Sequence, residues 1–274
     1  MLQTGSAKMM ATVFTESPRA LYPQLAKAAE RTLPPALALL AFILAWQLGT
    51  GWLGIPKYLL PAPSDLLVKF VTDRGLLASS FVATGYVAIV GFAVATLVAI
   101  PLGLAIASYS SLRRDLLPLI VCFDIIPKTI TAPLLIVWFG FGFTPRIALT
   151  AVMTFFPILV NSVAGFSAIN PRLHLITKSL GASLWQTFIL IRLPAAMPYI
   201  FAGFKVGVVH AVAASLTAEF ISANEGLEVL ILSASSDMDT PLMFAGVAAA
   251  ATLAMLLSSF LLGLEKIIMP WRSP

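Results

Sequence analysis

Charge is scarce in this sequence. Only 11% of its 274 residues are Asp, Glu, Lys or Arg, whereas a soluble globular domain carries roughly 25%. Hydrophobic residues make up 59% of the chain, which is more apolar surface than a soluble core needs. The composition therefore excludes an ordinary soluble domain and predicts an integral membrane protein.

Groups that bind metals or phosphates are also sparse. The single cysteine, Cys122, excludes an internal disulfide and a cysteine-based metal cluster, and the two histidines, His174 and His210, suggest no metal motif. We therefore expect no metal and no cofactor. The phosphate-binding pattern G-x4-G-K-[ST] is absent, as is any Gly-Lys dipeptide, so the chain is not expected to hydrolyse ATP itself.

Long runs with little or no charge predict an all-α fold with six transmembrane helices. Each can hold a helix of about 20 residues, enough to cross a hydrocarbon layer of ~30 Å. The runs are 32–56, 75–112, 129–145 with an apolar extension at 116–123, 147–171, 193–221 and 240–264. Pro127 and Pro133 are expected to kink the third helix, and Pro157 the fourth. Gly246 and residues 248–251 give the last helix a small-residue face.

The distribution of basic residues predicts the orientation. If the N-terminus is cytoplasmic, the inside segments hold eleven Lys and Arg and the outside segments four, the bias expected of cytoplasmic loops. Both termini are therefore expected inside, and the net charge of +5 needs no nucleic-acid partner. Residues 1–31 lack the apolar core of a signal peptide. They are expected to form either an amphipathic helix on membrane lipid or a partly disordered tail.

Two segments are expected on the outer surface. Ser64 follows a proline-rich turn and is expected to cap a short helix that lies along the membrane. The second segment, 222–241, is predicted to be a loop that contains four acidic residues and no Lys or Arg. Such an acidic rim either helps to receive an external protein or has no special role.

A polar hinge between two apolar runs, 170–194, is the most informative feature of the sequence. Asn170 followed by proline is a good helix start, and Gly181 can take the left-handed conformation that ends a helix. Ser183 and Gln186 form a capping-box pattern for a second helix, which Leu193-Pro194 is expected to end. The predicted apolar positions of the two helices are Leu173, Ile176, Leu180, Leu184, Phe188 and Ile191. From periodicity alone, the pair is either a connector that rests on lipid headgroups or an element that inserts into a groove on a soluble partner.

The hinge resembles a known signature. Gly181, nine residues and then Ile191-Arg192-Leu193-Pro194 match the G-x9-I-x-LP half of the EAA loop of binding-protein-dependent ABC transporter permeases. The segment SLGASLWQTFILIRLPAAMPYIFAGFK looks like the importer permeases for sulfonates, taurine and nitrate. The resemblance continues through LPAPSDLL, APLLIVWFGFG, FFPILVNSVAGF and the AEF…GLEVLI region, and covers roughly residues 60–267. One departure is that Leu175-Ile176-Thr177 stand where the family has Glu-Ala-Ala, so the contact of that Glu is lost or replaced.

The resemblance implies a subunit with the type I ABC importer fold in a bacterial inner membrane, not an enzyme. Its expected parts are a cytoplasmic segment 1–31, a first helix and outer loop 32–76, a transmembrane type-1 domain 77–267 and a cytoplasmic tail 268–274. Its expected partners are a cytoplasmic ATP-binding subunit, an external substrate-binding protein and a second permease copy, with a small organic or inorganic anion as substrate. The expected ATPase-coupling residues are Leu173, Ile176, Leu180, Gly181, Ala182, Ser183, Leu184, Gln186, Phe188, Ile191, Leu193 and Pro194.

Four polar residues inside the predicted spans are candidate pore residues. Asp124 and Lys128 lie four apart in the third span, so they either line the pore or pair on one helix face. Asn161 is expected to bond another helix or to line the pore. Glu219 lies near the outer end of the fifth span, where it contacts a gate or the binding protein or is simply solvated. Lys205 is expected to extend towards the cytoplasmic surface.

Two other classes of protein stay open from the residues alone. One is a carrier driven by an ion gradient, in which Asp124, Lys128 and Glu219 would be the coupling groups. The other is a membrane-embedded enzyme, which would need clustered catalytic side chains near one surface. The nearest such group is Arg113, Arg114 and Asp115, which looks like an orienting loop.

Overall fold

The computed structural model describes residues 21–168, 179, 181–222 and 224–271, and the regular elements among these residues are helices. The chain divides into two compact units, Met1–Asp65 and Leu66–Pro274. The first unit contains α2 (Leu21–Trp52), the segment after it and the first turn of α3 (Pro63–Thr72). The predicted first span, 32–56, therefore forms a helix that begins earlier and ends at Trp52.

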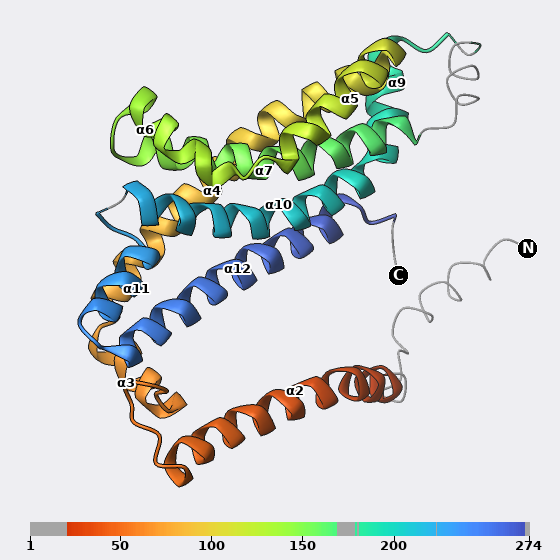
Figure 1. Cartoon of the computed structure of the whole chain (residues 1–274). Coiled ribbons are helices and arrows are strands. Elements are labelled where there is room, and N and C mark those ends of the chain that lie inside the picture. The colour runs from red at the N-terminus through yellow and green to blue at the C-terminus, as the bar shows by residue number, and fades with distance from the viewer. Residues whose placement is uncertain (1–20, 169–178, 180, 223, 272–274) are drawn as a thin grey trace, which may run out of the picture. The chain divides into compact units, whose positions relative to one another are not determined.

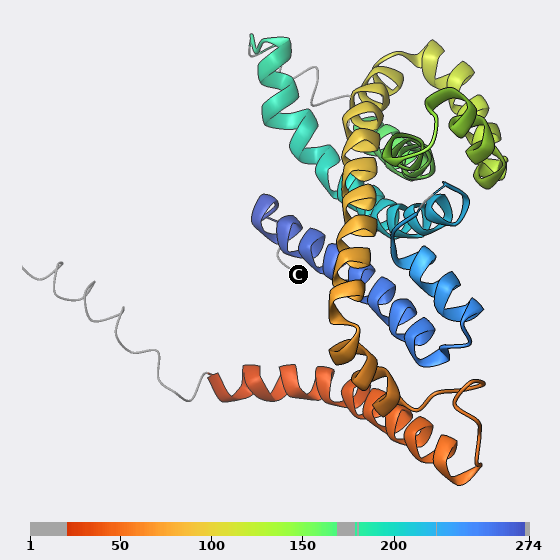
Figure 2. The same ribbon diagram turned by 90° about the vertical axis from the view of Figure 1, so that its left-hand side faces the viewer.

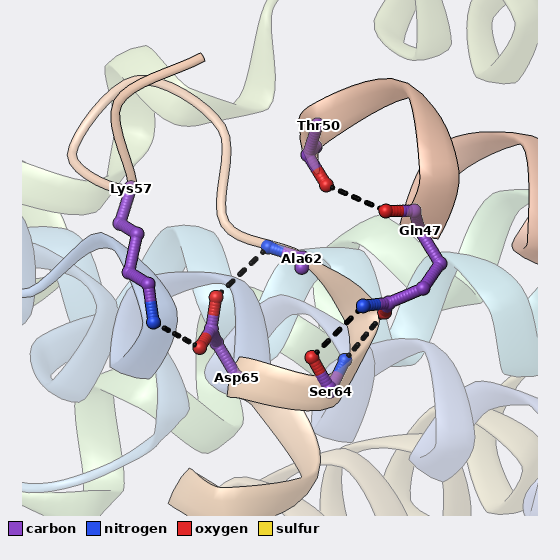
Figure 3. A network of polar contacts seen from close by, with 6 residues as sticks. All are labelled: Gln47, Thr50, Lys57, Ala62, Ser64 and Asp65. Atoms are coloured by element: carbon purple, nitrogen blue, oxygen red, sulfur yellow. Dashed lines mark hydrogen bonds and ion pairs between the residues drawn. The ribbon is translucent and has the colours of Figure 1, made fainter. Parts of the chain in front are cut away.

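A small polar network closes the first unit (Figure 3). The Gln47 side chain accepts the Ser64 backbone N–H at 3.0 Å and donates to the Ser64 hydroxyl at 3.1 Å. Asp65 accepts the backbone N–H of Ala62 at 3.1 Å and pairs with Lys57 at 2.6 Å. The prediction that Ser64 caps α3 is wrong, because its hydroxyl bonds Gln47 and the Asp65 carboxylate reaches back to the start of the helix instead.

The second unit holds the remaining helices (Figures 1 and 2). They are α4 (Arg74–Ser108), α5 (Ser110–Ile125), the 3-10 helix η2 (Lys128–Thr131), α6 (Ala132–Phe139), α7 (Phe143–Ser167), α9 (Leu184–Thr187), the π-helix η3 (Phe188–Arg192), α10 (Leu193–Ser222), α11 (Leu227–Ser236) and α12 (Thr240–Ile268). Among the described residues, four helices are long and apolar enough to cross a membrane: Arg74–Ser108, Phe143–Ser167, Trp185–Ile221 and Thr240–Ile268. These four correspond to the second, fourth, fifth and sixth predicted spans.

The third predicted span is not one helix. α5 ends at Ile125, and Ile126 is extended (φ −64°, ψ 126°) because the following Pro127 disfavours a helical conformation there. Pro133 lies in the first turn of α6, where its missing N–H leaves no helical bond unmade. The expected kink at Pro127 is thus a complete break, and the expected kink at Pro133 is wrong.

Close packing of α4, α7 and α10 forms the centre of the second unit. The core between α4 and α7 consists of buried apolar side chains: Ala95, Ala99, Ile106, Ala151, Ile158, Leu159 and Val163. A Cβ added at Gly103 of α4 would lie 2.7 Å from Ser162 of α7. A Cβ added at Gly203 of α10 would lie 2.9 Å from Asn161. Glycine at these positions lets the helix backbones approach closely.

α11 was not predicted. Its residues fall in the segment expected to be an acidic loop, yet Leu227, Leu230 and Ala234 are buried along one face. That face packs against α12, where a Cβ added at Gly246 would lie 2.8 Å from Ile231. The expected small-residue face of α12 is confirmed for Gly246, with Ala249 and Ala250 also buried.

The acidic residue before α12 has a structural partner. Asp239 accepts the N–H of Leu242 at 3.2 Å, which caps α12. It also pairs with Lys69 of α3 at 2.5 Å. The hydrogen bond that the Lys69 ammonium donates to the Asp239 carboxylate raises the pKa of Lys69. Part of the predicted acidic rim is therefore occupied by a contact within the chain.

Candidate functional site

The described half of the hinge is a glycine elbow followed by a capped helix. Gly181 has φ +72°, the left-handed conformation predicted for it. The Ser183 backbone N–H donates to the Gln186 side chain at 2.8 Å, and the Gln186 N–H donates to the Ser183 hydroxyl at 3.2 Å. The predicted capping box is therefore confirmed. Leu173, Ile176 and Leu180, which were expected to form the first helix, lie outside the described residues.

The second hinge helix does not end at Leu193-Pro194. It continues from α9 through η3 into α10, so residues Trp185–Ile221 form one apolar span. Pro194 has no N–H for the carbonyl four residues before it, and in the preceding turn the Leu193 N–H instead reaches back five residues to the Phe188 carbonyl. The wider π-turn keeps the chain helical where an α-helix would lose a bond. The predicted end was wrong because the π-turn accommodates Pro194 within the helix.

Only part of the predicted apolar stripe faces away from the bundle. Phe188 stacks on Phe166 of α7 at 6.4 Å and on Trp185 at 5.9 Å, and it packs against the buried cluster of Phe166, Ala196 and Ile200. Trp185 and Leu190 are 68% and 71% exposed. The most exposed apolar side chains of this segment are thus Trp185 and Leu190, followed by Ile189 at 40%; none of the three belongs to the predicted stripe of Leu184, Phe188 and Ile191.

A polar contact joins the hinge to α4. The Arg192 guanidinium donates to the Ser108 hydroxyl at 3.1 Å, and Ser108 is the last residue of α4. Together with the Phe188–Phe166 stack, this bond attaches the hinge to two membrane helices. Sequence spacing gave no sign of it, because the two residues are 84 positions apart.

Three candidate pore residues differ from expectation. Asp124 is exposed on the last turn of α5, whereas Lys128 begins η2 after the break at Pro127, so the two do not share a helix face. Asn161 donates to the Pro157 carbonyl on its own helix at 2.8 Å. The expectation that Asn161 bonds another helix is wrong, since its nearest acceptor lies one turn back on α7.

Lys205 also has a specific partner. Its ammonium pairs with Glu265 of α12 at 2.5 Å, and the two side chains are 42% and 16% exposed. Simple extension towards the cytoplasmic surface does not describe this residue. The pair holds α10 to α12 near the end of α12 that carries Ile268.

The fourth candidate, Glu219, is buried. Its side chain is 1% exposed, and its Oε2 accepts the backbone N–H of Glu228 at 3.1 Å. The prediction of a solvated helix end is wrong, and the carboxylate does not line an open surface in this structure. It lies inside the chain because α11 folds back over the end of α10.

Two further side chains bond the turn that Glu219 holds, residues 225–228. Thr84 of α4 accepts the N–H of Leu227 at 2.9 Å. Arg146 of α7 is 4% exposed, and it donates to the carbonyls of Gly142 at 2.9 Å and Glu225 at 3.4 Å. Side chains from three helices therefore converge on one turn of backbone.

Gly226 is the centre of this turn. Its φ is +130°, and a Cβ built on it would lie 2.3 Å from Cδ of Glu219. Only glycine fits both the conformation and the space. The sequence analysis included Gly226 only within the AEF…GLEVLI region of the family resemblance and did not predict its left-handed conformation.

Comparison with known proteins identifies the class. Residues 99–273 match the family described as binding-protein-dependent transport system inner membrane component. The chain belongs to this family: it is a membrane-embedded permease component of an ABC importer and not an enzyme.

Relatives and a solved structure agree with this assignment. The chain is 29% identical to a formylaminopyrimidine transport permease of Halalkalibacterium halodurans, over 90% of this chain and 98% of the relative. It is 32% identical to a riboflavin transport permease of Chloroflexus aurantiacus, over 88% and 90%, and 30% identical to the taurine transport permease of Escherichia coli, over 83% and 85%. A chain of the MetNI methionine ABC transporter in inward-facing conformations has a similar fold, with a TM-score of 0.64 at 17% identity over 71% of this chain and 97% of that one.

Proposed function

We propose that this chain forms the substrate pore of an ABC importer and is moved by a separate cytoplasmic ATP-binding subunit that docks on residues 170–194. The observation that carries the proposal is the elbow at Gly181 followed by a capped helix that exposes Trp185 and Leu190. Exposed apolar side chains on the first turns of this helix are suited to a groove on a soluble partner.

The same helix provides a path for force. We call residues 184–192, which comprise α9 and η3, the docking helix. The docking helix runs without interruption into α10, so displacement of its start also displaces α10. The Phe188–Phe166 stack and the Arg192–Ser108 bond carry the same displacement to α7 and α4. The hinge is therefore connected to all three central helices of the bundle.

The remaining partners follow from the family and the sequence. We propose a second permease copy that completes the pore and an external binding protein that delivers the substrate. The excess of Lys and Arg in alternate segments supports an inner-membrane orientation with both termini and the hinge in the cytoplasm. Among the candidate pore residues, Asp124 and Lys128 remain in the proposal, because a charged side chain at membrane depth favours water over lipid.

The substrate that we propose is a small organic or inorganic anion such as taurine, a sulfonate or nitrate. The taurine permease relative supports this class, and Lys128 would offer an anion a positive charge. The competing class is a heterocycle, because the formylaminopyrimidine and riboflavin permeases match the chain at similar identity. Calorimetric titration of the cognate binding protein, with taurine and with riboflavin, decides between them: taurine binding supports the anion, and riboflavin binding alone rejects it.

Neither rival class is favoured by the structure. A carrier driven by an ion gradient would use Asp124, Lys128 and Glu219 together, yet helix breaks separate the first two and the third is buried against α11. Such a carrier would also leave the exposed face of the docking helix unexplained. Arg113 and Arg114 lie on α5 and not in the expected loop. Arg114 forms an exposed ion pair with Asp115 at 3.0 Å, which does not make a catalytic cluster.

The docking proposal is tested with Trp185→Ala, and with Phe220→Ala as the matched control. Both residues are exposed aromatics on the same continuous helix, at opposite ends. If Trp185 fills a groove on the ATP-binding subunit, its removal weakens binding about tenfold or more, whereas Phe220→Ala leaves it unchanged. Affinity is measured with purified permease in nanodiscs and the cognate ATP-binding subunit. Equal affinity for Trp185→Ala and wild type, or uptake by the permease alone under an ion gradient, would reject the proposal.

A further inference from the structure

The buried cluster around the 225–228 turn lies at the opposite end of α10 from the docking helix. α10 has 30 residues, which corresponds to a length of about 45 Å. Gly181 and Arg192 precede its first residue, and Glu219 lies in its last turn. One rigid element therefore carries the proposed docking site at one end and a buried acid at the other.

Three contacts connect α11 to the central helices, and each uses a buried side chain. Thr84 bonds Leu227, Glu219 bonds Glu228, and Arg146 bonds Glu225. Thr84 and Glu219 thereby satisfy the first two N–H groups of α11, which have no partner inside their own helix. The three side chains come from α4, α10 and α7, which are the helices that the docking helix also contacts at the other end.

Packing reinforces these bonds. Leu227 is fully buried and Leu230 is 3% exposed, in a cluster that includes Leu77 of α4. The carboxylate of Glu219 fills the space beside Gly226 where a side chain would otherwise lie. Because the Glu219 side chain is only 1% exposed, its hydrogen bond to Glu228 is shielded from competition by solvent.

We propose that Glu219 is a positioning residue of the transport cycle: by capping α11 it makes the far end of the bundle move as one body when the docking helix is displaced. This rests on the proposed coupling to an ATP-binding subunit. Without the cap, α10 still tilts, but the start of α11 no longer follows it. The conformational change then fails to reach the end of the pore remote from the ATPase.

The test measures hydrogen exchange in the assembled transporter in nanodiscs, without nucleotide and after trapping with MgATP and orthovanadate. In the wild type, we expect slow exchange of the Leu227 and Glu228 N–H groups. On trapping, we expect their exchange rates to change together with those at the ends of α4 and α7. In Glu219→Ala, the buried N–H of Glu228 loses its acceptor, so its exchange is expected to rise about ten- to hundredfold. The response of the α11 start to trapping is expected to disappear while that of the docking helix remains.

Two variants separate positioning from general damage. Glu219→Gln keeps a carbonyl oxygen for the Glu228 N–H, and it is expected to restore the nucleotide response of α11 at least in part. Asp237→Asn makes the same acid-to-amide change at the other end of α11 and is expected to behave as the wild type. If Glu219→Ala does not assemble, Thr84→Val removes the acceptor for Leu227 within a similar volume and takes its place.

Each outcome is decisive. Wild-type protection of Leu227 and Glu228 in Glu219→Ala would show that the cap is not needed. Fast exchange with an unaltered nucleotide response would show that the cap is structural and does not position α11 during the cycle. A wild-type complex that shows no nucleotide response anywhere would instead reject the proposed function, while the exchange rates of the nucleotide-free protein would still report on the cap.

Discussion

Replacing Gly226 with alanine is expected to destabilise the protein much more than replacing Gly181 with alanine. At Gly226 the backbone conformation, φ +130°, is one that L residues rarely adopt, and holding it costs about 1–3 kcal/mol. The new Cβ would lie 2.3–2.6 Å from three atoms of the Glu219 carboxyl group. The carboxylate must therefore move away and give up its bond to Glu228, which is worth about 1.5–3 kcal/mol. The expected total is about 3–6 kcal/mol.

Gly181 is a matched reference for this change. Its φ is +72°, and nothing lies within 4 Å of the added Cβ, so the cost is limited to about 1–2 kcal/mol of left-handed strain. Thermal unfolding of the two variants in the same detergent, followed by fluorescence-detected size-exclusion chromatography, measures the difference. The middle values of the two ranges differ by about 3 kcal/mol, so we expect Gly226→Ala to lower the Tm by roughly 6–12 °C more than Gly181→Ala. Equal Tm values would refute the account of the 225–228 turn as a tightly packed cluster.

Three further changes test other contacts. Lys205→Met removes the ion pair with the largely buried Glu265 carboxylate at 2.5 Å, so it is expected to lower the Tm by a few degrees. Lys205→Arg retains the pair and is the control; equal Tm values for the two variants would contradict the expectation. Arg192→Met and Ser108→Ala remove one 3.1 Å bond, so a double-mutant cycle in thermal stability is expected to give a coupling of about 0.5–1.5 kcal/mol, and additive effects would show no interaction. The hydrogen bond from the Lys57 ammonium holds the pKa of the Asp65 carboxyl below its ordinary 3.8. The contribution of this ion pair to the stability of the fold is therefore present above about pH 4 and is lost as the pH falls through the lower pKa of the folded state. Exchange of the Ala62 N–H, compared between the wild type and Asp65→Asn over this range, measures the loss, and identical pH profiles would contradict it.

The sequence predicted the features that depend on local chemistry. Four of six spans follow directly from charge-free runs, and the left-handed Gly181 and the Ser183–Gln186 box follow from residue types that suit those conformations. Prediction failed where proline has two possible effects. Pro127 breaks a helix, whereas Pro194 is accommodated by a π-turn, and only the neighbouring packing distinguishes the two.

The buried polar cluster was not predictable for a different reason. Thr84, Arg146 and Glu219 are far apart in sequence, and each alone resembles an ordinary polar residue near a helix end. α11 itself carries an apolar pattern, Leu227, Leu230 and Ala234, at helical spacing, but the acidic residues around it outweighed that signal. Long-range contacts of this kind become visible only when the fold brings the helices together.

The two ends of α10 are attached by different physical means, and this difference has a mechanical consequence. At the docking end the attachments are exposed or half-buried: a ring stack through Phe188 and a hydrogen bond through Arg192. Water competes with contacts of this kind, so they allow small changes in the angle between the docking helix and its neighbours. At the far end, Glu219 and Arg146 are buried, and the glycine between them tolerates no added atom. Because breaking a buried charged contact is much more costly than bending an exposed one, a tilt imposed by the ATP-binding subunit is expected to change the angles of the contacts near η3, while α11 stays attached to the end of α10 and moves with it.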